Sequence, residues 1–427
     1  MEVLVIGGGL AGLSAAAALG SEGYRVRVLE ARPFLGGRAT SYEAGGETID
    51  NCQHVLLRCC VNLLDFYKRL GVSEHIVFHR EFYFLEPGGR KSVMRRSLPS
   101  FLGLGFLNIS EKIAIARALL AMRREHTARK DLDSITMQQW LEEKRQPVRA
   151  IDRFWRQVLV SAVNEDLDRM AASHGFQVFV LGFLSNPEFY QMGVPAVPLA
   201  RLYSTDAWRA LGNVEILQRS PAQSVTLEDG AVRSVATSGG VLHADFYISA
   251  VPFERMAQLV PELSLDLSQF EHSPITGIHL WFDRPITDLP HATLLDRTIQ
   301  WMFNKSEGRY VELVVSASRS LVDRKREDVI ALAVRELAEF FPAAKDARLE
   351  KSHVVKEIRA TFSAKPGLGN RRPESRTAIG NLFLAGDWTR SGWPATMEGA
   401  VRSGYLAAEA VTRAAGNPRP FLIPQVS

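Results

Sequence analysis

The first 30 residues combine two short apolar runs with one alanine-rich stretch. Val3 to Ile6 is a continuous apolar run that ends in glycines, which is typical of a buried parallel strand. Residues 13–19 are rich in alanine and predict a helix, and residues 25–29 predict a second strand. This part of the chain is therefore predicted to form a strand–helix–strand unit.

Farther along, the hydrophobic pattern changes character. Helical patterns dominate between residues 108 and 160, with Asn108 or Ser110 as the N-cap of the first helix. β-rich runs follow from residue 214, and Asp229-Gly230 between two of them predicts a hairpin turn. Alternating positions between 276 and 315 predict antiparallel strands, followed by a helix at 326–341. A last strand and helix are predicted at 382–386 and 400–414.

A glycine motif lies between the first predicted strand and helix. Gly7, Gly9 and Gly12 have the spacing of a dinucleotide-binding loop. Gly7 allows a tight turn, Gly9 lets the backbone approach a pyrophosphate, and Gly12 permits close packing of the helix on the strand. Glu30 ends the second strand, 30 − 12 = 18 residues after Gly12, where a carboxylate accepts hydrogen bonds from ribose hydroxyls. The motif predicts a bound dinucleotide and does not by itself separate FAD from NAD.

Composition narrows the class of protein. The 427 residues are 46% hydrophobic and 23% charged, which suits two soluble domains. A net charge of +4 is spread too thinly for a nucleic-acid partner. The three cysteines, Cys52, Cys59 and Cys60, form no C-x-x-C pair, so we expect buried free thiols and no metal site. The first apolar run begins at residue 3, and none approaches the length of a spanning helix, so we expect a cytoplasmic protein.

Two further segments favour FAD by resemblance. Glu30-Ala31-Arg32 followed by Gly36-Gly37-Arg38 resembles the extended FAD fingerprint of the amine oxidase and phytoene desaturase superfamily. Residues 381–388 and 394–400 resemble its C-terminal flavin motif, which implies that Asp387 contacts the ribityl chain or pyrophosphate and that a helix beginning near Met397 points its positive end at the flavin. The resemblance implies one FAD bound non-covalently. The residues expected to contact it are Gly7, Gly9, Leu10, Ala11, Gly12, Glu30, Ala31, Arg32, Gly36, Gly37, Arg38, Val225, Gly386, Asp387, Thr396 and Met397.

A narrower resemblance covers nearly the whole chain. Residues 50–57, 62–67, 164–166 and 193–199 resemble the squalene-associated FAD-dependent desaturase family, which includes the hydroxysqualene dehydroxylases of hopanoid biosynthesis. This implies reductive loss of the allylic hydroxyl of hydroxysqualene to give squalene, with Gln53 and His54 as the polar catalytic groups near the departing oxygen. Arg58 departs from the pattern, in which a small residue is expected.

The resemblance also implies an architecture: an α/β fold in which a Rossmann-like FAD-binding domain carries an inserted α+β substrate domain. We place the FAD-binding domain at residues 1–75, 205–265 and 371–418, and the substrate domain at 76–204 and 266–370. The dense apolar stretch at 176–184 fits a tunnel for a long apolar isoprenoid or a core helix, between which periodicity does not choose. No second G-x-G-x-x-G motif accompanies the first, so electrons are expected to come from an external donor.

Three other functions stay open at this point. A carotenoid desaturase of the phytoene type shares the fold and the apolar cavity. A flavin amine oxidase shares the FAD motifs, although the loop at 389–396 lacks the cysteine of amine oxidases that tether their flavin. The third open function is a sensor that binds flavin without catalysing a reaction.

Apolar and basic residues near position 100 predict an association with the inner face of the cell membrane. Arg95-Arg96 precedes a run that contains Phe101, Leu102 and Phe106, and a basic helix with Lys112 follows. Apolar residues bracketed by cations suit an interface with anionic lipid. The alternative is an internal loop packed on the protein's own core.

Overall fold

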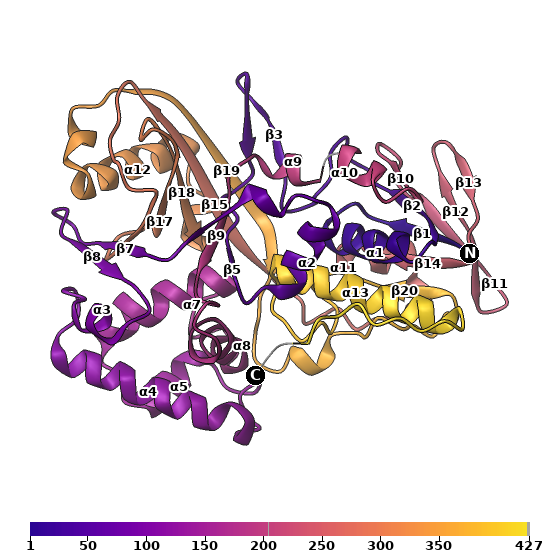
Figure 1. Cartoon of the computed structure of the whole chain (residues 1–427), viewed down its shortest axis with the longest axis horizontal. Coiled ribbons are helices and arrows are strands. Elements are labelled where there is room, and N and C mark those ends of the chain that lie inside the picture. The colour runs from indigo at the N-terminus through magenta and orange to yellow at the C-terminus, as the bar shows by residue number, and fades with distance from the viewer. Residues whose placement is uncertain (204, 425–427) are drawn as a thin grey trace.

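The computed structural model describes residues 1–203 and 205–424 (Figure 1). Its first layer is a parallel five-stranded sheet of order β10–β2–β1–β14–β20, assembled from distant parts of the chain. Both faces of β1 are buried, since its odd-numbered valines and its Leu4 and Ile6 belong to different core clusters. The strands are β1 (Glu2–Ile6), β2 (Arg25–Leu29), β10 (Val214–Leu217), β14 (Phe246–Ser249) and β20 (Leu382–Leu384).

Two long helices begin at the carboxyl edge of this sheet and pack on each other. α1 (Leu10–Ser21) follows β1, and α13 (Met397–Ala414) follows β20. They approach so closely that a Cβ at Gly404 would lie 2.2 Å from the carbonyl oxygen of Ala11. Because each helix follows a parallel strand, both N-termini open at the edge where ligands of such sheets bind. α2 (Val61–Arg69) packs against both helices.

The second large layer is a seven-stranded sheet of order β19–β15–β18–β17–β16–β7–β8. Its residues alternate between two faces as the sequence predicts, and Ile278, Leu280, Val311 and Leu313 share a core with α12 (Arg326–Phe340). The opposite face therefore points away from α12. The strands are β7 (Phe82–Leu85), β8 (Lys91–Met94), β15 (His272–Phe282), β16 (His291–Leu294), β17 (Trp301–Ser306), β18 (Tyr310–Ser316) and β19 (Leu349–Phe362).

Helices from residues 98–185 form a separate layer, at the lower left of Figure 1. Asn108 begins the longest of them with a capping box to Glu111, so Asn108 and not Ser110 is the N-cap. The segments are α3 (Leu98–Leu102), α4 (Ile109–Ala128), α5 (Met137–Glu143), α6 (Val148–Ala150), the π-helix η2 (Ile151–Trp155), α7 (Arg156–Val163), α8 (Ala172–Phe179) and the π-helix η3 (Val180–Ser185). Among the described helices, none is long and apolar enough to cross a bilayer.

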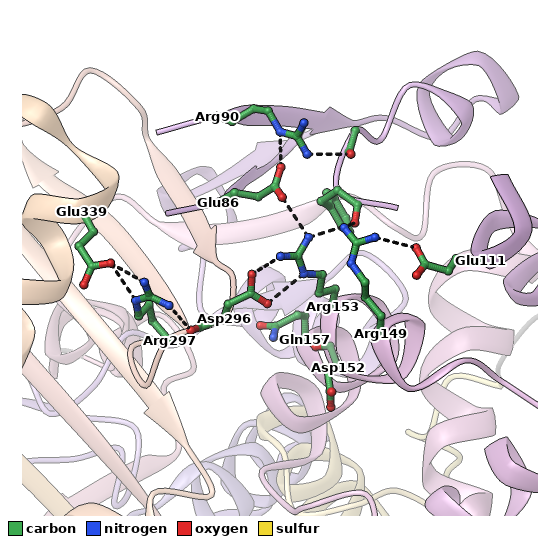
Figure 2. Close-up of polar contacts among 12 residues, drawn as sticks. Glu86, Arg90, Glu111, Arg149, Asp152, Arg153, Gln157, Asp296, Arg297 and Glu339 are labelled. Atoms are coloured by element: carbon green, nitrogen blue, oxygen red, sulfur yellow. Dashed lines mark hydrogen bonds and ion pairs between the residues drawn. The ribbon is translucent and has the colours of Figure 1, made fainter. Parts of the chain in front are cut away.

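An ion-pair network ties this helical layer to the seven-stranded sheet (Figure 2). Arg153 of η2 contacts Glu86, which follows β7, at 3.0 Å, and its Nε donates to Asp296, which follows β16, at 3.0 Å. Arg149 of α6 donates to the carbonyl of Phe106 at 2.9 Å, and Arg153 donates to the same oxygen at 3.2 Å. Segments far apart in the sequence are thereby fixed to one another.

Smaller elements complete the fold. The predicted hairpin at Asp229-Gly230 is confirmed: both residues have positive φ, and the turn joins β11 (Ser224–Glu228) to β12 (Ala231–Thr237). The remaining strands are β3 (Ser41–Ala44), β4 (Glu47–Asp50), β5 (Leu56–Leu57), β6 (Ile76–His79), β9 (Met192–Pro195) and β13 (Gly240–Leu242). The remaining α-helices are α9 (Leu199–Leu202), α10 (Thr205–Arg209) and α11 (Phe253–Leu259).

The run near residue 100 is exposed only in part, which corrects the sequence interpretation. Phe106 is fully buried and packs against Phe84 in a tilted arrangement, with ring centroids 5.0 Å apart, and Phe101 is half-buried. Lys112 is also buried, and its ammonium donates to the carbonyl of Leu102 at 2.6 Å. Leu102 is exposed, as expected. Phe106 and Lys112 therefore cannot face a membrane.

Candidate functional site

A cavity of about 720 Å³ lies between the carboxyl edge of the five-stranded sheet and the face of the seven-stranded sheet that points away from α12. It gathers most of the residues predicted to contact a flavin, together with Gln53 and His54. Gly12 and Val225 are the two predicted contacts that do not line it. The predicted residues that do are Gly7, Gly9, Leu10, Ala11, Glu30, Ala31, Arg32, Gly36, Gly37, Arg38, Gly386, Asp387, Thr396 and Met397.

The glycine loop is shaped by close backbone approaches. Gly7 has φ +113°, and a Cβ there would lie 2.8 Å from the carbonyl oxygen of Ala250. A Cβ at Gly12 would lie 2.0 Å from the carbonyl oxygen of Gly7. Gly12 therefore supports the loop from behind, as predicted for helix–strand packing, while Gly7 and Gly9 border the cavity.

Glu30 is held beside this loop by two backbone donors. Its carboxylate accepts from the Gly8 amide at 2.8 Å and from the Arg32 amide at 2.7 Å, and the side chain is 8% exposed. Each carboxylate oxygen retains capacity for a further hydrogen bond. A buried carboxylate at the edge of the cavity is suited to hydroxyl donors of a ribose.

A second glycine pair lies directly against the first loop. The Gly36 amide donates to the Gly8 carbonyl at 2.9 Å, and a Cβ at Gly36, where φ is +96°, would lie 2.3 Å from the Ala39 carbonyl. Arg38, just beyond the pair, forms an ion pair with Asp387, which follows β20. Segments predicted separately to bind one flavin are therefore adjacent in the structure.

The N-terminus of α13 opens onto the opposite wall of the cavity. Thr396 is its N-cap, since its hydroxyl accepts from the Gly399 amide at 3.0 Å. Thr396 and Met397 line the cavity. Because a helix N-terminus carries positive potential, it favours the negative charge that a reduced flavin holds. The glycine cradles, Glu30 and the termini of α1 and α13 together fit FAD.

Pro221 and Ala222, which line the cavity on the nucleotide side, were not predicted from the sequence. The residue expected there was Val225, three residues after Ala222. Val225 is half-buried against the core and lies on β11, outside the cavity wall. A segment between two strands carries no motif, so its position could not be read from the sequence.

Gln53 and His54 both line the cavity, and their environments differ. The Gln53 side-chain oxygen accepts from the Lys305 ammonium at 2.8 Å, and its nitrogen donates to the His54 carbonyl at 3.1 Å. His54 Nδ1 lies 2.7 Å from the Cys52 carbonyl. Burial lowers the pKa of His54, although carbonyls and nearby carboxylates oppose that effect. His54 is therefore a neutral, backbone-anchored imidazole.

The seven-stranded sheet forms the floor of the cavity through a row of residues that lie opposite one another on adjacent strands. The row runs from Phe84 to Thr293, Trp301, Val314 and Gly277. The first four line the cavity, and Phe82, Met94, Val158, Phe183 and Phe303 extend its apolar wall. Such cross-strand rows join residues that are distant in sequence, so no sequence motif predicts them.

Other residues considered in the sequence have structural roles. Glu165 is fully buried, bound to Arg319 at 2.7 Å, and does not reach the cavity. Arg58 donates to the Gln191 side chain at 3.0 Å and stacks on Phe78, so the turn it occupies is well supported. The apolar stretch at 176–184 is divided: Phe176 and Phe179 lie in the core, while Val178 and Phe183 line the cavity. The three cysteines are buried and free.

Comparison with known proteins identifies the family. The model of the flavin-containing amine oxidoreductases matches residues 10–412. The chain belongs to this family. It is an FAD-dependent oxidoreductase, with the α/β architecture predicted from its sequence. The boundaries proposed for the two domains stay a prediction.

Curated relatives of this flavoprotein include carotene desaturases. It is 27% identical to the 15-cis-phytoene desaturase of an Oncidium hybrid cultivar, over 97% of this chain and 78% of that protein. It is 26% identical to the 15-cis-phytoene desaturase of Synechococcus elongatus, over 96% of each chain. Among solved structures, a triple mutant of putrescine oxidase gives a TM-score of 0.74 at 18% identity, covering 97% of this chain and 98% of that one. At that identity the structural likeness shows the fold alone.

Proposed function

We propose that this flavoprotein uses FAD to change the oxidation state of a long apolar isoprenoid chain. The observation that carries the proposal is the continuity of the cavity, which joins the FAD-contacting loops to a wall built from Phe82, Phe84, Met94, Phe183 and Phe303. A hydrocarbon chain gains free energy by leaving water for such a wall. When bound, FAD supplies two-electron chemistry by accepting or donating hydride.

Desaturation of a carotenoid-like chain is the reaction that the comparisons support better. The relatives matched over nearly the whole chain are named as phytoene and zeta-carotene desaturases. In such a reaction the protein's own part is to bind the chain, hold one C–C bond at the flavin end of the cavity and exclude water. The apolar wall is suited to each of these tasks.

Reductive dehydroxylation of hydroxysqualene is the second candidate. Two of the segments that resemble the squalene-associated desaturases lie at this cavity. Gln53 and His54, from residues 50–57, line its wall, and Gly193, from residues 193–199, follows the wall residue Met192. The C–O bond breaks, the hydroxyl leaves as water with a proton, and a hydride forms the new C–H bond. An external donor must then supply two electrons for each turnover.

Product analysis separates these reactions. Purified holoenzyme is incubated with phytoene, hydroxysqualene or squalene, in one series with oxidised flavin and in another with pre-reduced flavin, both without oxygen. Desaturation predicts new double bonds and bleaching of the flavin with phytoene. Dehydroxylation predicts squalene and flavin reoxidation with hydroxysqualene. A flavin that responds to a primary amine and to none of the three chains would overturn the proposal.

We also propose that the protein associates with the inner face of the cell membrane through α3 and the first turns of α4. Leu98, Leu102, Ile109 and Ile113 are exposed there by 70%, 55%, 76% and 47%. Arg96 and Arg117 are also exposed there, and Arg123 and Arg124 are exposed farther along α4. Met94, just before α3, lines the cavity, so a chain drawn from lipid would enter close to this surface.

Liposome co-sedimentation tests the surface. Changing Leu98, Leu102 and Ile109 to serine should abolish binding to vesicles that contain anionic phospholipid. Val241 is 58% exposed on β13, and Val241→Ser serves as the matched control. Equal binding by the triple variant and the control would place the contact elsewhere.

A further inference from the structure

A buried polar cluster adjoins the cavity beneath Gln53. On the seven-stranded sheet, Glu312 lies opposite His279 on one side and opposite Phe303 on the other. It therefore occupies the same face as Val314 and Ser316, which line the cavity. The cluster is one row of the sheet away from the apolar floor.

Glu312 and Lys305 form the centre of this cluster. Glu312 is fully buried, its carboxylate oxygens have no hydrogen bond, and the Lys305 ammonium lies 3.4 Å from one of them. The same ammonium lies 3.5 Å from the carboxylate of Asp50. Burial lowers the pKa of Lys305, but Glu312 and Asp50 outweigh it and raise that pKa overall. Lys305 is thus a fixed cation between two carboxyl groups.

Other titratable groups surround Glu312 and Lys305, but none of those described below supplies a second positive charge. Burial lowers the pKa of His279 to about 3, so it is neutral. Tyr310, two residues before Glu312 on β18, has a pKa raised by burial and is also neutral. Burial raises the pKa of Glu312 to about 7, against the opposing effect of Lys305. The further groups facing the cluster are Tyr42 on β3, His353 and Glu357 on β19.

Lys305 determines which way the Gln53 amide faces. A lysine ammonium has donors only, so the amide oxygen of Gln53 must be the atom that faces it at 2.8 Å. The amide nitrogen is then turned the other way, where one N–H donates to the His54 carbonyl at 3.1 Å. A second N–H remains on a side chain that lines the cavity.

We propose that Lys305 is a positioning residue, which holds the Gln53 amide with one N–H toward the cavity to receive an oxygen atom on the isoprenoid chain. Glu312 and Asp50 keep Lys305 in place. The inference rests on the second candidate of the proposed function and deepens it, since it names the substrate class as a long prenyl chain that carries a hydroxyl group. In a cavity with a largely apolar wall, an oriented N–H donor favours the oxygenated chain over the hydrocarbon of equal length.

A paired binding experiment tests this without turnover. Quenching of tryptophan fluorescence, with Trp301 in the cavity wall, reports binding of squalene and of hydroxysqualene to oxidised holoenzyme. The wild-type protein should bind the alcohol about 3- to 10-fold more tightly than the hydrocarbon. Gln53→Leu and Lys305→Met should each lose this preference while keeping the affinity for squalene and the FAD content. The double variant should lose nothing more, because Lys305 acts through Gln53.

Three further variants keep the test decisive. Lys305→Met leaves two buried carboxyl groups without their cation, so Lys305→Met with Glu312→Gln is the variant that should fold if the single one does not. Glu312→Gln alone should keep the preference, since Asp50 still contacts Lys305. Lys351 stacks over Trp281, outside the cavity wall, so Lys351→Met should behave as wild type.

The outcomes separate the two ideas. If neither chain binds the wild-type protein but phytoene does, the positioning role fails and the proposed function stands; if none of the three chains binds, the proposed function fails. If both chains bind equally well, or if the Lys305 and Gln53 losses multiply in the double variant, only the positioning role is overturned. An alcohol preference that survives Lys305→Met would have the same consequence.

Discussion

Glu30 offers the most direct test of the cofactor site. Glu30→Ala removes a carboxylate that accepts from the Gly8 and Arg32 amides at 2.8 and 2.7 Å and that borders the cavity. In the apoprotein, water can replace it at the cavity edge. Bound FAD displaces that water, so the lost hydrogen bonds are felt in the complex. We expect FAD affinity to fall by about 1–3 kcal/mol, which is about 5- to 150-fold in Kd.

The assay is a fluorescence titration of apoprotein with FAD, in parallel with thermal unfolding. Glu30→Gln keeps the shape and one acceptor, so its Kd should lie between those of wild type and Glu30→Ala. Glu327 is exposed on α12, and Glu327→Ala is the matched control. If Glu30→Ala lowers the unfolding temperature of the apoprotein but leaves the FAD Kd unchanged, Glu30 only supports the loop and the reasoning is wrong.

Three other predictions concern stability. Burial raises the pKa of Glu312 to about 7, so the folded state keeps a proton that the unfolded state releases above a pKa near 4.5. The stabilisation from this bound proton is complete below pH 4.5 and is lost as pH rises to 7, by roughly 3 kcal/mol. The pH profiles of urea unfolding for wild type and Glu312→Gln should therefore diverge across that window. Thr293 is fully buried and its hydroxyl has no partner, so Thr293→Val should raise the free energy of unfolding by about 1 kcal/mol. Thr276→Val, which breaks a 2.9 Å hydrogen bond to Ser318, should lower it. A lower free energy of unfolding for Thr293→Val would mean that the Thr293 hydroxyl binds water. Arg153→Met should lower the free energy of unfolding in urea by about 1–3 kcal/mol, because Glu86, Asp296 and the Phe106 carbonyl all lose a donor (Figure 2). The control is Arg348, whose ion pair with Glu350 is exposed: Arg348→Met should change the free energy of unfolding by less than about 0.5 kcal/mol.

The nucleotide loop could be predicted because its contacts are local. Gly7, Gly12 and Glu30 act within one strand–helix–strand unit, and their chemistry follows from spacing alone. The C-terminal motif added Asp387 and Met397 by resemblance, and the structure places both at the same cavity. Periodicity also showed that Val311, Leu313 and Val315 share one face of a strand.

The rest of the site depends on pairing between distant strands. Alternation puts Glu312 on the face opposite Val311, but it does not say that this face borders a cavity or that Lys305 and Gln53 meet there. The row that includes Phe84 and Thr293 joins segments 293 − 84 = 209 residues apart. Phe106 shows the converse limit, since an apolar residue beside exposed ones can still turn into the core.

The strand order of the parallel sheet has a consequence for biosynthesis. Its edge strand β20 begins at Leu382, and both Asp387 and α13 follow it, whereas β1 is made first. During synthesis, the early loops must therefore wait for β20 and the start of α13 before the flavin cradle can close. Long-range pairing of this kind slows folding and leaves apolar strand edges unpaired in the meantime. A nascent chain that stops before β20 therefore lacks the part of the FAD site that Asp387 and the N-terminus of α13 supply.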